Sequence, residues 1–176
     1  RYLWMGTFHS IFARLLRQEA ALLGFTHDYT IYDTTDSNSV IKHIIKDFNL
    51  ADKLYKPHVV HARISMAKNN LQSPNQYAAD REYLLRDRFD KMNEMARIYA
   101  EYNRRLKAAN AMDFDDILVN TYTLLQKYPE VAERYQQLFQ YILVDEYQDT
   151  NRAQYMIIRT LAEQHQRICV VGDDAQ

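Results

Sequence analysis

Apolar residues recur with helical spacing through most of the chain, and this pattern predicts a mainly α-helical protein. Residues that begin or end helices separate the apolar stripes: Ser10 suits an N-cap, Gly24 a helix end and Pro57 a first helical position. Together these signals predict helices over residues 11–23, 34–48, 57–70 and 75–109. The last of these helices is so long that we expect a break in it near Asp80–Leu84.

The pattern changes after residue 110, where short apolar runs alternate with helical stripes. Asp113 and Pro129 favour helix starts. The strand, helix and strand that are predicted to follow cover residues 141–144, 152–163 and 168–171. Such alternation is typical of a parallel sheet. Residues 2–6 and 29–32 are expected to be extended as well.

Two adjacent carboxylates, Asp145 and Glu146, directly follow the apolar run of residues 141–144. Ligands of open parallel sheets bind at the carboxyl ends of the strands. Carboxylates placed there can hold Mg²⁺, and a second acid can orient or deprotonate an attacking water. For the acid pair taken alone, two solvated side chains that open a loop remain the simpler interpretation.

The longer string Asp145-Glu146-Tyr147-Gln148-Asp149-Thr150 is more specific, because it resembles the Walker B motif of the UvrD/Rep/PcrA family of superfamily 1 DNA helicases. Three further segments resemble motifs of that family and occur in the family's order. They are Thr7-Phe8-His9-Ser10, a DNA-contacting motif; Met112-Asp113-Phe114-Asp115-Asp116, a Leu-Asp-Phe-Asp-Asp segment with Met in first place; and Val170-Val171-Gly172-Asp173-Asp174-Ala175-Gln176, the opening of motif III.

The resemblance implies a mainly α fold, in which an all-helical subdomain called 1B is inserted into an incomplete RecA-like parallel α/β domain of the P-loop NTPase class. Residues 1–10 would start this motor domain, residues 11–110 form the insertion, and residues 111–176 carry Walker B and the start of motif III. The sequence has three glycines and no Gly-x-x-x-x-Gly-Lys-Ser/Thr phosphate loop. We therefore expect a piece of a longer helicase, inactive by itself.

The resemblance also implies roles around ATP and Mg²⁺, neither of which is expected to bind tightly to the chain alone. Asp145 would hold Mg²⁺ through water, and Glu146 would be the general base that positions the attacking water. Gln148 would couple the nucleotide state to DNA, and Gln176 would sense the γ-phosphate. An ordinary loop or capping amide remains an open interpretation of Gln148.

Other polar residues beside these motifs have expected positions too. Asp173 and Asp174 end the second strand and are expected to line the same crevice as the Walker B acids. Asp149 and Thr150 are suited to cap the helix that starts near residue 152.

Five residues are candidates for DNA contact. Thr7, Phe8, His9 and Ser10 lie at a predicted strand-to-helix junction, where hydroxyls and a helix N-terminus suit phosphate. Lys68 lies in a Ser-x-Ala-Lys-Asn segment that resembles a duplex-facing part of the helical subdomain in close relatives. The family implies single-stranded DNA and single-strand/double-strand junctions as partners. The structural alternative is that Ser10 is a plain cap and Phe8 a core residue.

Composition constrains the partners and the compartment. The first 110 residues carry 17 Lys/Arg against 12 Asp/Glu, whereas residues 111–176 carry 5 against 11, so the basic surface and the acids are separated along the chain. No apolar run approaches a membrane span, and the single cysteine, Cys169, is expected to be buried. His58 and His61 could share a helix face, but no third metal ligand is evident.

The resemblance points to an ATP-dependent 3′–5′ DNA helicase that acts in DNA repair or replication in the bacterial cytoplasm. Two alternatives stay open: a helicase–nuclease of the AddA/RecB kind, and a helical module that binds DNA or protein without catalysis. Because few strands support the expected sheet, its exposed edges would also favour a non-physiological dimer of the piece.

Overall fold

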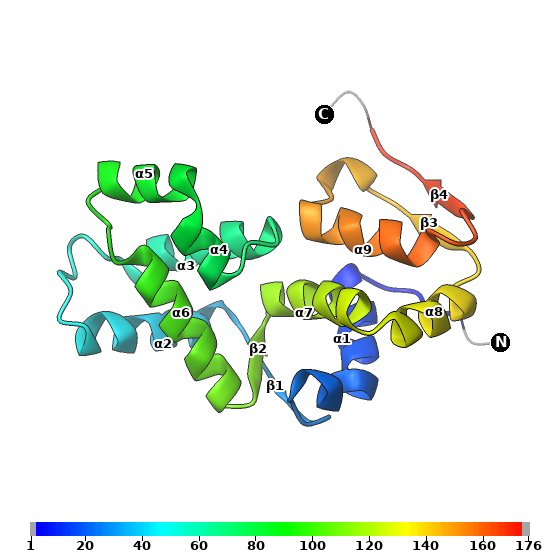
Figure 1. Ribbon diagram of the computed structural model, residues 1–176, viewed down its shortest axis with the longest axis horizontal. Coiled ribbons are helices and arrows are strands. Elements are labelled where there is room, and N and C mark those ends of the chain that lie inside the picture. The colour runs from blue at the N-terminus through cyan, green and yellow to red at the C-terminus, as the bar shows by residue number, and fades with distance from the viewer. Residues whose placement is uncertain (1–2, 174–176) are drawn as a thin grey trace.

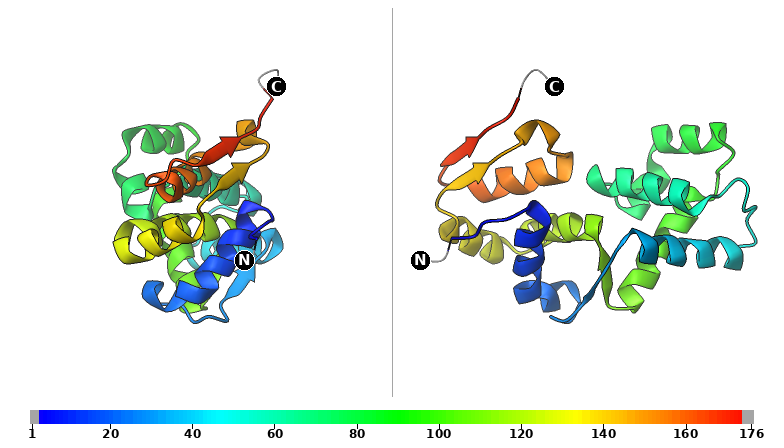
Figure 2. Two further views of the ribbon diagram at one scale, coloured as in Figure 1. Left: turned by 90° about the vertical axis from the view of Figure 1, so that its right-hand side faces the viewer. Right: turned by 180° about the vertical axis from the view of Figure 1, so that it is seen from behind.

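The computed structural model describes residues 3–173, which are mainly α-helical, as predicted, with two short pairs of parallel strands (Figure 1). Two blocks of helices lie side by side, with β1 and β2 between them (Figures 1 and 2). In chain order the elements are α1 (Phe8–Glu19), η1 (Ala20–Leu23), β1 (Thr30–Tyr32), α2 (Thr34–Asp47), α3 (Pro57–Asn69), α4 (Pro74–Ala79), α5 (Arg81–Phe89), α6 (Met95–Ala108), β2 (Ala111–Asp113), α7 (Phe114–Lys127), α8 (Pro129–Leu138), β3 (Ile142–Val144), η2 (Tyr147–Asp149), α9 (Arg152–Ala162) and β4 (Ile168–Val170). Within residues 3–173, no helix combines the length and the apolar character needed to cross a membrane.

The first block, which we term the sheet block, comprises α1, η1, α7, α8, α9, β3 and β4. The apolar stripe of α1 packs against α7, which also packs against α9, so that segments far apart in sequence share one core. Leu15, Leu16, Leu124 and Ile157 are completely buried there. Burial of this common core fixes α1 to the end of the chain that carries the Walker B-like acids.

The second block, which we term the helical block, comprises α2–α6 and has a separate core. Ile41 and Ile44 of α2 meet Ile64 of α3 and the tyrosines of α4 and α6, Tyr77 and Tyr102, all of them buried. The hydroxyl of Tyr77 donates to Asp87 (2.7 Å). These tyrosines therefore pack in the core, and the hydroxyl of each has a hydrogen-bond partner.

Strands β1 and β2 form the link between the blocks, and they pair in parallel with Thr30 opposite Ala111 and Tyr32 opposite Asp113. Residues 29–32 were expected to be extended, whereas β2 was not foreseen. Because α1 shares the core of the sheet block, packing places the start of the helical block after β1 rather than at residue 11. The identity of the helical block with the family's 1B insertion stays a prediction.

Most helices begin at a side-chain cap, although the caps of α1, α2 and α9 differ from those predicted. Thr7, not Ser10, caps α1, and its Oγ1 accepts from the Ser10 backbone N–H (3.3 Å). Asp33, one residue before the predicted helix over residues 34–48, caps α2 in a capping box with Asp36. Asp113 caps α7 as predicted, also in a capping box. Within each cluster of polar residues, backbone geometry decides which one becomes the cap.

The long polar segment after residue 74 forms three helices, α4, α5 and α6, instead of one. The predicted break occurs at Asp80, whose extended backbone ends α4 and whose carboxylate caps α5. A second break, over residues 90–94, was not predicted. There Lys91 adopts a left-handed conformation (φ 59°) and the side chain of Met92 turns into the core. Burial of Met92 thus overrides the helical preference of this polar stretch.

Strands β3 and β4 form the predicted parallel pair, with Leu143 opposite Cys169. Cys169 is exposed rather than buried, because all three residues of β4 face solvent. Residues 3–6 form no strand, and position 2 lies outside the described residues. Among the described residues the pair therefore has no third strand beside it, and the predicted dimer stays a prediction.

Candidate functional site

The site is built around the end of β3, where a buried strand residue is followed by two exposed acids. Val144 is buried, whereas Asp145 and Glu146 both face solvent. Glu146 has a left-handed backbone (φ 52°), and its N–H donates to Asp145 Oδ1 (2.9 Å). The other described non-glycine residues with positive φ follow helix ends, so Glu146 alone among them follows a strand. Such a conformation is uncommon for a non-glycine residue and marks the point where the chain turns from β3 into η2.

Gln148 holds the acid segment against the residues that follow β4. Its Nε2 donates to Glu146 Oε2 (2.6 Å), and its Oε1 accepts from the Asp173 N–H (3.1 Å). Gly172 permits this approach, because a Cβ added there would lie 2.8 Å from Gln148 Oε1. The backbone of Asp173 therefore lies next to the acid segment, whereas the expectation that its side chain lines the same crevice as the acids stays a prediction. Asp174 and Gln176 lie outside the described residues.

The helix after the acids begins at neither of the two residues that the sequence predicts as its cap. Asn151, rather than Asp149 or Thr150, caps α9 and forms a capping box with Gln154. Thr150 instead donates its hydroxyl to the Tyr147 carbonyl (2.7 Å) and closes the 3-10 turn η2. The segment from Asp145 to Thr150 is thus anchored by β3 at one end and by the start of α9 at the other.

The Thr7–Ser10 segment lies across a cavity from these acids. The cavity has a volume of about 430 Å³, and both Thr7–His9 and Val144–Glu146 line it. Thr7 and Ser10 are exposed, whereas Phe8 and His9 are half-buried, with Phe8 packed against the core. The structure therefore brings together two motifs that are far apart in sequence. Whether these residues contact DNA stays a prediction.

Lys68 does not lie on a surface that could face DNA. Its side chain is 1% exposed, and its Nζ forms ion pairs with Asp113 Oδ2 (2.7 Å) and Asp116 Oδ1 (2.8 Å). Burial alone would lower the pKa of Lys68, but the charges of Asp116 and Asp113 outweigh burial and raise this pKa above its usual value. A phosphate could not replace these two carboxylates without leaving them unpaired inside the protein. The expected phosphate contact at Lys68 is therefore corrected to a buried ion-pair role.

Burial and the charge of Lys68 together shift the pKa values of Asp113 and Asp116 in opposite directions. Burial raises the pKa of Asp116 to about 6, because it outweighs the attraction of Lys68. Asp113 is also buried, yet Lys68 and the hydrogen bonds that Asp113 accepts hold its pKa below its usual value. One of those bonds comes from the Tyr102 hydroxyl (2.8 Å). These groups form a closed polar cluster between α3, α6 and α7.

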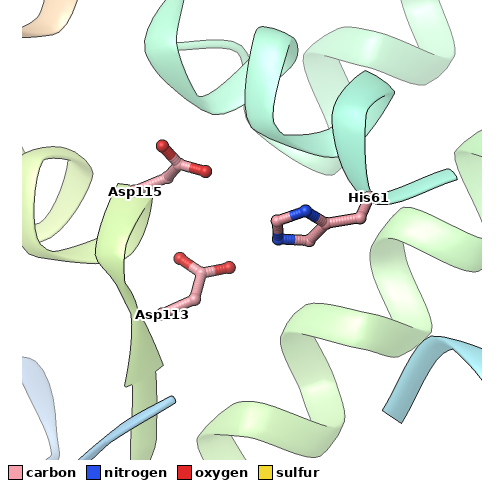
Figure 3. Close-up of side chains that lie close together, drawn as sticks. All are labelled: His61, Asp113 and Asp115. Atoms are coloured by element: carbon pink, nitrogen blue, oxygen red, sulfur yellow. The ribbon is translucent and has the colours of Figure 1, made fainter. Parts of the chain in front are cut away.

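Three side chains at the edge of this cluster have the spacing of metal ligands. His61 of α3 faces Asp113 and Asp115 at the start of α7, and their ligand atoms lie within 4.8 Å of one another (Figure 3). The structure thus supplies the further ligands that the sequence did not reveal. However, Asp113 already pairs with the ammonium group of Lys68, which would repel a cation at this point. We therefore assign these three side chains to the buried ion-pair cluster and not to a metal site.

Comparison with known proteins identifies the family of this chain. The family model described as UvrD/REP helicase N-terminal domain matches residues 1–176, and the chain belongs to this family. Over 174 residues it is 43% identical to the ATP-dependent DNA helicase PcrA of Staphylococcus aureus and 42% identical to that of Bacillus subtilis, with 99% of this chain and 23% of each relative covered.

A third relative extends the comparison to another genus. The ATP-dependent DNA helicase UvrD1 of Mycobacterium bovis is 42% identical over 184 residues, covering 100% of this chain and 24% of the relative. The chain thus spans about a quarter of the length of the curated relatives it matches. These matches establish the family of the chain, but not the activity of a whole protein.

Proposed function

We propose that this chain is the part of an ATP-dependent DNA helicase that joins the acids of ATP hydrolysis to a DNA-contacting segment. The observation that carries this proposal is the single cavity lined by both Thr7–His9 and Asp145–Glu146. The names of the PcrA and UvrD1 relatives support it. They also favour a helicase over the helicase–nuclease alternative. The 3′–5′ direction and a role in repair or replication belong to the same proposal.

The exposed acids are suited to a metal–nucleotide complex in both chemistry and position. Mg²⁺ would neutralise phosphate charge during phosphoryl transfer. Asp145, at the carboxyl end of a parallel strand, would hold the ion through water. Glu146 would accept the proton of the attacking water, and Gln148, which donates to Glu146, would orient its carboxylate. The sequence contains no phosphate loop, so we expect the chain alone to be inactive.

DNA contact is assigned to the segment opposite the acids. Thr7 and Ser10 present exposed hydroxyls at the N-terminus of α1, a position that favours phosphate. His9 lines the cavity beside them. We propose that these residues contact single-stranded DNA and that Phe8 holds the segment against the core.

A second function, DNA binding by the helical block, is favoured by the surface of α5. Leu85 and Phe89 are 51% and 86% exposed there, and Arg81 and Arg88 are exposed nearby on the same helix. Exposed apolar and basic residues side by side suit a nucleic-acid partner. Salt-dependent binding of duplex DNA that weakens in Arg81→Ala and Arg88→Ala would support this second function.

The deciding experiment measures ATP hydrolysis by the full-length protein with and without single-stranded DNA. Glu146→Gln should retain ATP binding and lose at least about a hundredfold in turnover, since general-base catalysis contributes about that much or more. Glu163→Gln, an exposed acid beyond the end of α9, serves as the matched control and should turn over like wild type. Normal turnover by Glu146→Gln would contradict the assignment of Glu146 as the base.

A further inference from the structure

One side chain of the helical block reaches the starts of two helices of the sheet block, α7 and α9. Asn69, the last residue of α3, accepts a hydrogen bond from Asn151 Nδ2 (2.8 Å) and donates to Asp115 Oδ1 (3.1 Å). Asp115 lies in the first turn of α7, and Asn151 is the N-cap of α9. Asn69 and Asn151 are 82 residues apart in sequence, so no local pattern could have revealed the contact.

The position of Asn69 is fixed by its neighbour Lys68. Because Lys68 pairs with Asp113 and Asp116 inside the protein, the end of α3 cannot shift along α7 without separating buried charges. Asn69 therefore meets Asn151 at a fixed place. The contact differs in this respect from a hydrogen bond between two mobile surface side chains.

Asn151 directly follows the segment that carries Asp145 and Glu146. This segment is short, its two acids are exposed, and its glutamate has a strained backbone. The start of α9 is its anchor on the side away from β3. We propose that Asn69 is a positioning residue that holds this anchor, through Asn151, and thereby keeps Glu146 in place. The inference rests on the proposed function, because it concerns the same acid.

The test uses the full-length protein and measures kcat and KM for ATP in the presence of single-stranded DNA. Asn69→Ala removes the contact from one side. Asn151→Ser removes it from the other but keeps a good N-cap, so that α9 is preserved. Asn70→Ala is the matched control, because Asn70 is exposed at the same helix end and, among the described residues, its side-chain amide donates to the Met66 carbonyl and, at 3.5 Å, to the Tyr83 hydroxyl.

We expect kcat to fall about fivefold in both contact variants, the factor that corresponds to one lost hydrogen bond of ordinary strength. KM should change less than twofold, and the control should match wild type. The double variant Asn69→Ala/Asn151→Ser should be no worse than either single variant, because both remove the same contact. A general loss of structure would not give this pattern.

The outcomes separate this inference from the proposed function. If wild type shows no DNA-stimulated hydrolysis, the proposed function fails, and with it the inference. If wild type is stimulated but both contact variants turn over like Asn70→Ala, the inference is overturned while the proposed function stands. A raised KM with unchanged kcat, or additive losses in the double variant, would also overturn it. Circular dichroism of each variant checks folding, and Asn151→Ser remains informative if Asn69→Ala does not fold.

Discussion

Two groups of carboxylates in this chain occur in similar local settings but in opposite environments. Asp113 and Asp116 lie where β2 leads into α7, and Asp145 and Glu146 lie where β3 leads towards α9. The first pair is enclosed and paired with Lys68, whereas the second pair faces solvent and, among the described residues, is hydrogen-bonded to a backbone N–H and a side-chain amide. The comparison teaches that an acid pair after a strand is not by itself a catalytic sign. The two pairs differ in their partners. The first already forms ion pairs with a lysine of the protein, and the second forms none among the described residues.

The largest loss of stability is expected when the buried ion pairs of Lys68 are removed. Lys68→Met would leave Asp113 and Asp116 buried without their cation, so the free energy of unfolding should fall by about 3–5 kcal/mol. Urea denaturation of the chain measures this loss. Lys42→Met, at an exposed position of α2, is the control and should have little effect. A loss below about 1 kcal/mol for Lys68→Met would contradict the ion-pair role.

The pH dependence of stability should change when Asp116 can no longer titrate. Folding raises the pKa of Asp116 from 3.8 to about 6, so the folded state keeps its proton to higher pH, and this group's contribution to stability falls as the pH rises through that window. Asp116→Asn removes this dependence. Between pH 4 and pH 7, the variant should therefore gain stability relative to wild type, by up to about 3 kcal/mol.

Urea titrations of both proteins at several pH values provide the measurement. The lowered pKa of Asp113 acts in the opposite direction, since its contribution is lost as the pH falls, but it is present in both proteins. Parallel stability curves for wild type and variant would show that Asp116 has an ordinary pKa in the folded protein.

Much of the fold followed from local signals because those signals act over a few residues. Caps and prolines located helix starts at Pro57, Pro129 and Asp113, and the apolar runs gave β3 and β4 in parallel. The second break in the long helical segment and strand β2 could not be found in this way. Both depend on packing against residues that are distant in sequence.

The candidate site likewise has one part that the local sequence predicts and one part that depends on residues distant in sequence. The string from Asp145 to Thr150 was recognisable because its residues are contiguous, and the structure places it at a strand end. The fate of Lys68 was not recognisable, since its partners lie 45 or more residues away and only the fold brings them together. A lysine in a polar helix is ordinarily solvated, so burial here is a property of the tertiary structure.

The smallest effect on stability is expected at the exposed acids. The charge of Glu146 is solvated, and a glutamine there could still accept the hydrogen bond from Gln148. Glu146→Gln should therefore change the free energy of unfolding by less than about 0.5 kcal/mol, even though it should lower turnover in the full-length protein by at least about a hundredfold. The same urea titration that detects the loss in Lys68→Met measures it. A loss as large as that of Lys68→Met would mean that the Glu146 carboxylate is needed for the fold, and the contrast between the two acid groups would then fail.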